Sequence, residues 1–209
     1  SKIDSTIPIV SEEIFVDWQT RKKWNKYWLI DPLDGTKEFI NKNDEFTVNI
    51  ALIENNKPVL GVIFVPALST LYFASKDYGS YKIYCSSNLS SLNESNKIQV
   101  NEKKRTNHLL VIGSRSHSNE SFNQWVKENI EDYKLIKAGS SLKFCHIADG
   151  SADLYPRFGP TSEWDIAAGH IILMEAGGSI LSVDNNEIAY NTKEDILNPY
   201  FIASCKLSN

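Results

Sequence analysis

The sequence has few cysteines and no long apolar run. Three cysteines occur among 209 residues, at Cys85, Cys145 and Cys205, and none of them shares a Cys-x-x-Cys spacing. This sparse and odd set excludes a disulfide framework and a cysteine zinc site, and it indicates reduced thiols. No apolar run approaches the roughly 20 residues that span a bilayer, and the printed chain opens without a charged-then-apolar leader. We therefore expect a cytoplasmic protein without stable membrane insertion.

The chain also lacks a basic excess. It carries 22 Lys and Arg against 26 Asp and Glu, which gives a net charge of −4. A surface that binds a nucleic-acid polymer needs surplus positive charge, so we expect no such partner. A small anionic molecule needs only a few local cations and fits this composition. Hydrophobic and charged contents of 42% and 23% are ordinary for a globular chain.

Two halves of the chain differ in their apolar patterns. The first half predicts strands at 27–31, 46–54, 58–65, 70–74 and 81–84, with residues 55–57 as a hairpin connection. An exposed loop rich in Ser and Asn is predicted at 85–97. The second half predicts strands at 109–115, 133–139, 153–158, 179–183 and 200–205, alternating with helices at 118–130, 140–150 and 162–178. This organisation predicts an α/β fold of two packed lobes, residues 1–105 and 106–209.

Two aspartates follow the first strand-like run at once. In WLIDPLDGTKEFI, Asp31 ends the run and Asp34 comes three residues later. The stretch can be a simple turn, because Asp, Pro and Gly are common turn residues. It can also hold a magnesium ion, because close carboxylates repel each other without a cation, and the carbonyl of Leu33 offers another oxygen. Gly35 and Thr36 would then open a short helix whose free N–H groups bind phosphate.

Further acids lie far away in the sequence. Glu12 and Glu13 precede the pair, and Asp165 opens the last predicted helix. Asp165 can be a simple helix cap, or it can point into the same cleft as the aspartate pair. Hydrolysis of an inert phosphate monoester depends on charge neutralisation more than on a covalent nucleophile. Paired divalent ions on such carboxylates would lower the pKa of a bound water and stabilise both reacting oxygens.

Several motifs occur in a fixed order along the chain. PIVSEE (8–13), WLIDPLDGTKEFI (28–40) and WDIAAGHIILMEAGG (164–178) resemble the signature segments of the inositol monophosphatase superfamily, the magnesium-dependent and lithium-sensitive phosphatases. Within it, DPLDGTKEFI, DEFTVNIALI (44–53), SRSH (114–117), GSSLKFC (139–145) and YPRFGPT (155–161) are similar to the bisphosphate nucleotidases of sulfur assimilation. The resemblance runs from about residue 8 to the end of the chain.

The resemblance implies a layered α+β sugar-phosphatase fold of αβαβα order and a set of metal ligands. Two or three Mg²⁺ ions would be held by Glu12, Asp31, Asp34, Asp165 and the carbonyl of Leu33. Glu12 and Thr36 would orient the attacking water, which makes Thr36 the implied catalytic residue. The backbone of Gly35 and Thr36 would cradle the scissile phosphate, and Asp165 would also contact the substrate.

On the substrate side, the resemblance assigns adenosine-phosphate contacts to Ser114, His117, Gly139 and Lys143. Arg157 suits a bidentate phosphate contact. Three of these residues have a plainer interpretation from the sequence alone. Lys143 can be a solvated helix lysine, Arg157 a partner in a surface ion pair, and His117 an ordinary polar loop residue.

The implied reaction is removal of the 3′-phosphate from 3′-phosphoadenosine 5′-phosphate, giving AMP and phosphate. An inositol- or sugar-phosphate phosphatase with the same metals is the alternative enzyme. A non-catalytic nucleotide-binding module is the other alternative, because the family has an N-terminal helical segment that does not precede Ser1 here. We therefore expect the N-terminal helices of the fold to be missing from the printed sequence.

Overall fold

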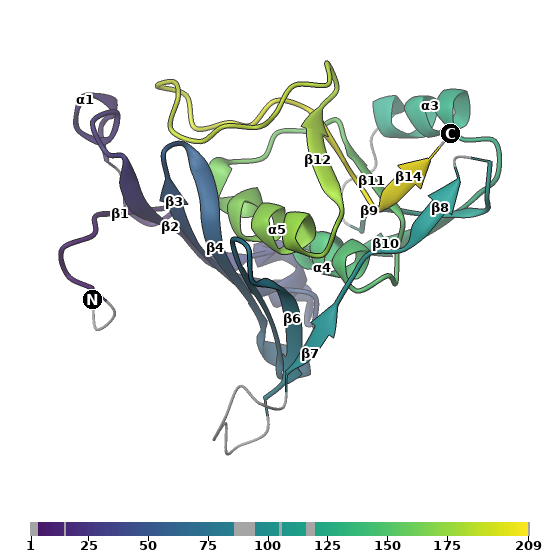
Figure 1. Ribbon diagram of the computed structural model, residues 1–209, viewed down its shortest axis with the longest axis horizontal. Coiled ribbons are helices and arrows are strands. Elements are labelled where there is room, and N and C mark those ends of the chain that lie inside the picture. The colour runs from purple at the N-terminus through teal and green to yellow at the C-terminus, as the bar shows by residue number, and fades with distance from the viewer. Residues whose placement is uncertain (1–3, 15, 86–94, 105, 116–119, 209) are drawn as a thin grey trace.

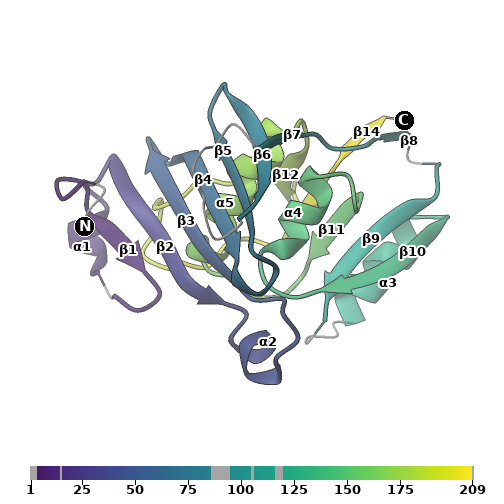
Figure 2. The same ribbon diagram turned by 90° about the horizontal axis from the view of Figure 1, so that it is seen from below.

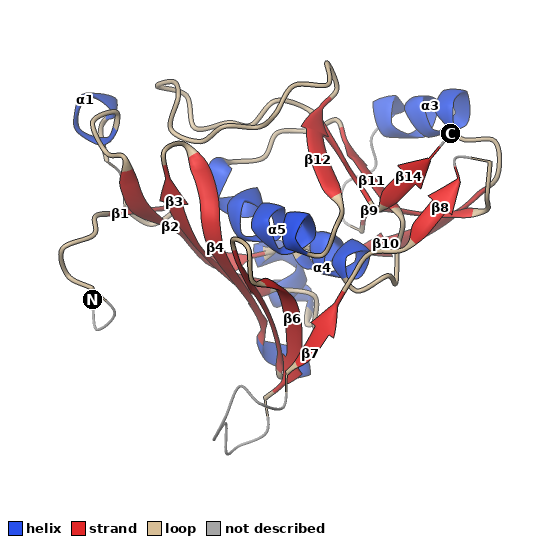
Figure 3. Cartoon of the chain, viewed as in Figure 1, coloured by secondary structure: helices blue, strands red, loops and turns tan. Residues whose placement is uncertain are grey.

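Two large β-sheets and the helices between them make up the molecule (Figure 1). The structure is a computed structural model, and it describes residues 4–14, 16–85, 95–104, 106–115 and 120–208. Helices and strands alternate as layers (Figure 3). Among the helices of these ranges, none combines the length and the apolar character that crossing a bilayer requires.

The first sheet is built almost entirely from the first half of the chain. Its seven strands lie in sequence order: β1 (Ile9–Ser11), β2 (Lys26–Asp34), β3 (Thr47–Glu54), β4 (Lys57–Val65), β5 (Thr70–Ser75), β6 (Gly79–Tyr84) and β7 (Asn96–Ile98). All neighbours are antiparallel except β1, which is parallel to β2. Asn55 and Asn56, both with positive φ, form the predicted hairpin turn between β3 and β4.

The second sheet comes from the second half. Its five strands lie in the order β10 (Tyr133–Ala138), β9 (Leu109–Ser114), β11 (Leu154–Arg157), β13 (Phe201–Ser204) and β12 (Ser179–Ser182). β9 is parallel to both β10 and β11, so these strands end at the same edge. A small parallel pair, β8 (Glu102–Lys104) with β14 (Lys206–Ser208), lies beside it.

The helices fill the space between the sheets or cover an outer face. They are α1 (Trp18–Arg21), α2 (Thr36–Asn41), the 3-10 turn η1 (Pro66–Leu68), α3 (Glu120–Asn129), α4 (Leu142–Ala148) and α5 (Glu163–Glu175). α5 packs on β2 to β6 of the first sheet and on β12 of the second, and α4 packs on α5 and β11. α3 contacts β11 and the cluster around Leu109 and Val126. α2 follows β2 at the rim of the first sheet (Figure 2).

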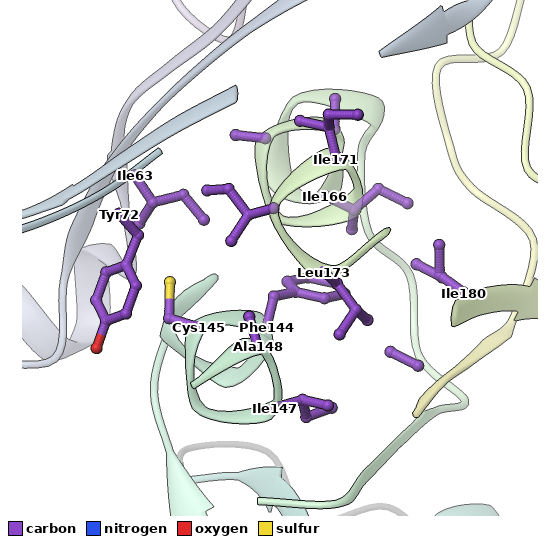
Figure 4. Packing of buried hydrophobic residues seen from close by; sticks show 14 of the residues in the cluster. Ile63, Tyr72, Phe144, Cys145, Ile147, Ala148, Ile166, Ile171, Leu173 and Ile180 are labelled. Carbon is purple, nitrogen blue, oxygen red and sulfur yellow. The ribbon is translucent and has the colours of Figure 1, made fainter. Parts of the chain in front are cut away.

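The core lies where α4 and α5 meet both sheets (Figure 4). Ile63 and Tyr72 of the first sheet face Cys145 of α4, while the Phe144 ring of α4 packs against Tyr155 and Phe201 of the second sheet. α5 is apolar on nearly all sides, as expected for a helix buried between two layers. This central helix pair therefore lies in an apolar cluster that contains residues of both halves, while Leu109, Val111 and Val126 belong to a second, smaller cluster.

Most long elements match the sequence predictions, so the layered α/β fold class is confirmed. The 85–97 loop prediction is wrong at its end, because Asn96–Ile98 form β7, while 86–94 lie outside the described residues. The helix predicted at 118–130 is described from Glu120. Within the described residues the layers follow the order first sheet, helices α4 and α5, second sheet, and helix α3. The division into lobes at residue 105 stays a prediction.

Candidate active site

Asp31 and Asp34 lie at the bulged end of β2. Asp31 is opposite Asn49 of β3 and Asp34 is opposite Thr47, with a register shift between them that contains Leu33. Asp31 is 1% exposed, and its Oδ1 accepts the N–H of Leu33 at 2.9 Å. The stretch is therefore a strand end with a local turn-like hydrogen bond, not a free surface turn.

Asp34 is held by donors that reach one of its oxygens. Oδ2 accepts the N–H of Ser141 at 2.6 Å, the amide of Asn49 at 3.2 Å and the hydroxyl of Thr47 at 3.4 Å. The Ser141 hydroxyl also contacts Thr47 Oγ1 at 2.8 Å and Asn49 Oδ1 at 2.7 Å. These contacts fix the carboxylate plane, and Oδ1 is the oxygen that remains for a further ligand.

Glu12 is brought beside Asp31 by the pairing of β1 with β2. Ser11 is opposite Ile30, and the N–H of Glu12 donates to the carbonyl of Ile30 at 3.3 Å. The side chain of Glu12 is exposed, as is that of Glu13. The parallel edge strand thus carries an acid to the end of β2, as a converging acidic site requires.

Asp165 caps α5 and belongs to the acidic cluster as well. Its Oδ2 accepts the N–H of Ser162 at 2.8 Å in a capping box, which confirms the helix-cap interpretation. Burial, followed by the negative charges of Asp34 and Glu12, raises the pKa of Asp165 to about 7. The two interpretations of Asp165 are therefore compatible.

The four acids share one electrostatic environment. Burial raises the pKa of Asp31 to about 8, and the negative charges of Asp34, Glu12 and Asp165 contribute to this rise. The hydrogen bond from the Leu33 N–H acts in the opposite direction and lowers the pKa. Burial also raises the pKa of Asp34, opposed chiefly by the positive charge of Lys143. Carboxylates that disfavour one another's ionised form in this way are stabilised by a cation.

The chemistry of the donors fits a hard divalent cation, although the side chains do not form a closed cage. Among the described residues, no three His, Cys, Asp or Glu side chains converge closely enough to hold an ion. The coupling among these carboxylates is electrostatic, and it acts over longer distances than a metal–oxygen bond. The predicted ligands are carboxylate and carbonyl oxygens, which Mg²⁺ prefers.

A cavity of about 230 Å³ opens next to Asp34 and Asp165. Its lining contains these predicted site residues: Asp34, Gly35, Thr36, Ser114, Lys143, Arg157 and Asp165. Asp31, Leu33 and Glu12 lie outside this lining, at the adjoining end of the first sheet. The cavity therefore combines two acids of the cluster with three cations, Lys37, Lys143 and Arg157.

Gly35 and Gly139 let two segments approach closely at the cavity. Gly35 has φ +87 and is the N-cap of α2, which begins at Thr36 as the sequence predicted. Gly139 lies behind the cavity wall, where a Cβ would lie 2.5 Å from Glu38 Cγ. The structure thus gives Gly139 a packing role, and its contact with substrate stays a prediction.

Lys143 is a buried cation, so the interpretation as a solvated helix lysine is wrong. Its Nζ donates to the carbonyl of Ser140 at 2.6 Å and lies 5.3 Å from the centre of the Tyr155 ring. Burial lowers its pKa to about 8, although the charge of Asp34 acts in the opposite direction. An anion in the cavity would stabilise the protonated amine.

Arg157 lies between this cavity and a second one. Its Nη2 donates to the carbonyl of Pro160 at 3.0 Å, and no ion pair among the described residues involves it. Its buried Nε has no hydrogen-bond partner within the described residues. A ligand oxygen would satisfy that donor, which supports a substrate role over a surface ion pair.

The second cavity, of about 240 Å³, shares Ser114, Tyr155 and Arg157 with the first. The rest of its lining is mostly apolar, with the two cations Arg115 and Lys137: Gly113, Arg115, Phe122, Asn123, Leu135, Ile136, Lys137, Pro156, Phe158 and Gly159. His117 lies outside the described residues, so its predicted contact stays a prediction.

The sequence predictions missed the residues that orient Asp34. Thr47 and Asn49 face inward on β3, where the following inward residues, Ala51 and Ile53, are apolar. Two polar side chains at inward positions of a buried strand were the available signal. Ser141 gave no such signal, because its contact with Asp34 joins segments 107 residues apart.

Comparison with known proteins shows which family the chain is similar to. A sequence profile of the Inositol monophosphatase family matches residues 4–206. The chain belongs to this family. The 3'(2'),5'-bisphosphate nucleotidase CysQ of Salmonella typhimurium is 45% identical over 195 residues, which are 93% of this chain and 74% of that protein. The protein of the same name from Buchnera aphidicola is 45% identical over 213 residues, covering 98% and 74%.

A solved structure of a family member has the same fold. The crystal structure of CysQ from Bacteroides thetaiotaomicron, a bacterial member of the inositol monophosphatase family, matches with a TM-score of 0.89 and 41% sequence identity. The match covers 97% of this chain and 78% of that one. The layered arrangement described above is thus the arrangement of the family.

Proposed function

We propose that the protein is a magnesium-dependent phosphomonoesterase that removes the 3′-phosphate from 3′-phosphoadenosine 5′-phosphate, giving AMP and phosphate. The observation that carries the proposal is the first cavity. There Asp34 and Asp165 of the acidic cluster lie in one lining with Lys143 and Arg157. Acids for a cation beside cations for a phosphate are the parts that phosphoryl transfer needs. Relatives sharing 45% of its residues carry the name of this activity.

Glu12, Asp31, Asp34, Asp165 and the Leu33 carbonyl would hold two or three Mg²⁺ ions, which supply a water of lowered pKa and charge neutralisation. The chain's own residues do the rest. Thr36 lines the cavity and is exposed, so its hydroxyl is able to orient the attacking water together with Glu12. Lys143 and Arg157 bind phosphate oxygens and orient the ester.

The second cavity favours a nucleotide over an inositol or sugar phosphate. Phe122, Phe158 and Leu135 give it an apolar and aromatic side, which suits a planar base better than a polyol. Its position beyond Arg157 leaves room for the nucleoside while the 3′-phosphate occupies the first cavity. The buried acids also favour an enzyme over a binding module, because a module would have no need to bury like charges together.

Phosphate release tests the proposal. The full chain is assayed with Mg²⁺ on 3′-phosphoadenosine 5′-phosphate, inositol 1-phosphate and fructose 1,6-bisphosphate. We expect the nucleotide to have the highest kcat/KM and chelation of Mg²⁺ to abolish its turnover. Faster turnover of the inositol or sugar ester would reject the nucleotide assignment, and nucleotide binding without turnover would favour the module.

Two further properties belong to the proposal. All three cysteines are free thiols, which suits a reducing cytoplasm. Lithium inhibition follows from the cation site, because a monovalent ion in place of Mg²⁺ would supply too little charge. Removal of the adenosine bisphosphate would place the protein in sulfur metabolism.

A further inference from the structure

Glu45 joins the first-sheet half of the chain to the second sheet. It lies between α2 and β3, and its Oε2 accepts Arg115 Nε and the N–H of Gly139, both at 2.7 Å. Its Oε1 accepts Arg115 Nη2 at 2.6 Å. One carboxylate therefore collects three donors; we call Glu45, Arg115 and Gly139 the Glu45 clasp.

The two partners of Glu45 follow neighbouring parallel strands. Arg115 comes directly after β9 and lines the second cavity, and Gly139 comes directly after β10. Arg115 also donates from Nη2 to the Lys137 carbonyl at 3.0 Å and from its backbone N–H to the Ala138 carbonyl at 3.2 Å. The Glu45 clasp thus fixes the strand ends that form the substrate side of both cavities.

The turn that starts at Gly139 has a strained backbone. Ser140 has φ +44, a left-handed conformation that a serine rarely adopts. Such a conformation persists only where its surroundings hold it. The Gly139 N–H is bound to Glu45 on one side, and the Ser141 N–H is bound to Asp34 on the other. Lys143 holds the carbonyl of Ser140 between them.

We propose that Glu45 is a positioning residue that keeps the 139–141 turn and Arg115 in their substrate-binding conformation. Without it, the Gly139 end of the turn loses its acceptor and Ser140 relaxes towards an ordinary backbone conformation. Substrate binding must then restore the strained turn. The apparent affinity falls in proportion to the fraction of free molecules whose turn is still in the binding-competent conformation. The chemical step, which depends on the acids of the first sheet and α5, changes less. The inference rests on the proposed function for its substrate.

Kinetics of Glu45→Ala test the inference, with Glu54→Ala as the matched control. Glu54 is the last residue of β3, the strand that begins shortly after Glu45. Its carboxylate makes a partly exposed ion pair with Lys26 at 3.3 Å. We expect Glu45→Ala to raise KM for 3′-phosphoadenosine 5′-phosphate about tenfold while kcat changes less than about threefold. Glu45→Gln, whose amide oxygen still accepts the Gly139 N–H, should recover part of the loss. Glu54→Ala should leave both constants unchanged.

Hydrogen exchange separates this inference from the proposed function. In the free protein, the amide of Gly139 should exchange faster in Glu45→Ala than in the wild type, and it should not in Glu54→Ala. This readout needs no substrate, so a wild type that fails to hydrolyse the nucleotide would reject the function and leave the exchange test standing. Unchanged exchange at Gly139, or a KM in Glu45→Ala equal to that of Glu54→Ala, would overturn the inference. Should Glu45→Ala not fold, Glu45→Ser, whose side chain is too short to reach the Gly139 N–H, takes its place with the same expected results, and unchanged Gly139 exchange or KM there overturns the inference.

Discussion

At the scale of single residues, the orientation of Asp34 decides which oxygen faces the cavity. The donors from Thr47, Asn49 and Ser141 converge on Oδ2, two from β3 and one from the N-cap of α4. A ligating carboxylate whose partners are removed loses its fixed orientation, and this costs metal affinity. The polar residues behind Asp34 therefore also contribute to the affinity for the cation.

Asn49→Ala tests that account of Asp34. The variant removes the amide that donates to Oδ2 and that accepts from the Ser141 hydroxyl. We expect the Mg²⁺ concentration for half-maximal phosphate release to rise about 10–100-fold. Calorimetric titration with Mg²⁺ should show the same weakening without substrate. Asn129→Ala is the control, at an exposed position of α3 whose side chain donates to the Trp125 carbonyl of the same helix. Equal Mg²⁺ requirements in both variants would contradict the account.

His170 gives the stability a pH dependence of its own. It is 8% exposed in α5, and its Nδ1 lies 2.9 Å from the hydroxyl of Tyr190. Burial lowers its pKa to about 4; the negative charge of Glu187 opposes this shift, and the positive charge of Lys57 adds to it. The unfolded chain, with a pKa of 6.5, binds the proton first as the pH falls. The contribution is therefore complete above pH 6.5 and is lost between there and pH 4, up to about 3 kcal/mol.

Urea unfolding above pH 6.5 and at about pH 5 measures the contribution of His170 to the free energy of unfolding. Subtracting the free energies of unfolding of wild type and His170→Gln removes the titration of the many acids that both proteins share. We expect the wild type to lose more stability on acidification than the variant. His108→Gln, at an exposed histidine paired with Asp132, should keep the wild-type slope. The same slope in His170→Gln and the wild type would disprove this assignment.

At the scale of elements, α5 has the most demanding environment. It is covered by both sheets and by α4, and Gly169 lets it approach α4 closely. A Cβ at Gly169 would lie 2.5 Å from Cδ2 of Phe144. The close approach, and not backbone conformation, is the reason for glycine at this helical position.

Gly169→Ala should destabilise the protein despite the better helix propensity of alanine. Overpacking a filled core costs roughly 1–3 kcal/mol, which exceeds the gain of about 1 kcal/mol from replacing a helical glycine. Met174→Ala, at a half-exposed position of the same helix, should change the free energy of unfolding by less than about 0.5 kcal/mol. Urea denaturation compares the two variants. A more stable Gly169→Ala protein would show that α4 moves to make room.

The long elements were predictable from sequence and the short ones were not. β3 alternates buried and half-buried residues along its length, and α5 is long and apolar, so periodicity was sufficient for both. β8 and β14 have three residues each and exist because Lys206–Ser208 lie beside Glu102–Lys104. A segment of that length has no measurable period, and its partner is more than a hundred residues away.

At the scale of the whole molecule, the site forms where segments from both halves meet. The motifs located Asp34, Thr36, Lys143, Arg157 and Asp165, and all five line one cavity. The motifs could not show that Lys143 is buried or that Glu45 reaches Gly139, because both depend on how the sheets pack. The sequence motifs thus predicted which residues form the site. Only the tertiary structure shows which neighbouring residues hold them in place.

Anomalous diffraction from crystals grown with Mn²⁺ in place of Mg²⁺ tests the central claim most directly. The account predicts anomalous density between Asp31, Asp34 and Asp165, with Oδ1 of Asp34 towards it and Oδ2 still bound to Ser141. Crystals without density there, in which these carboxylates point into separate regions of solvent, would contradict it.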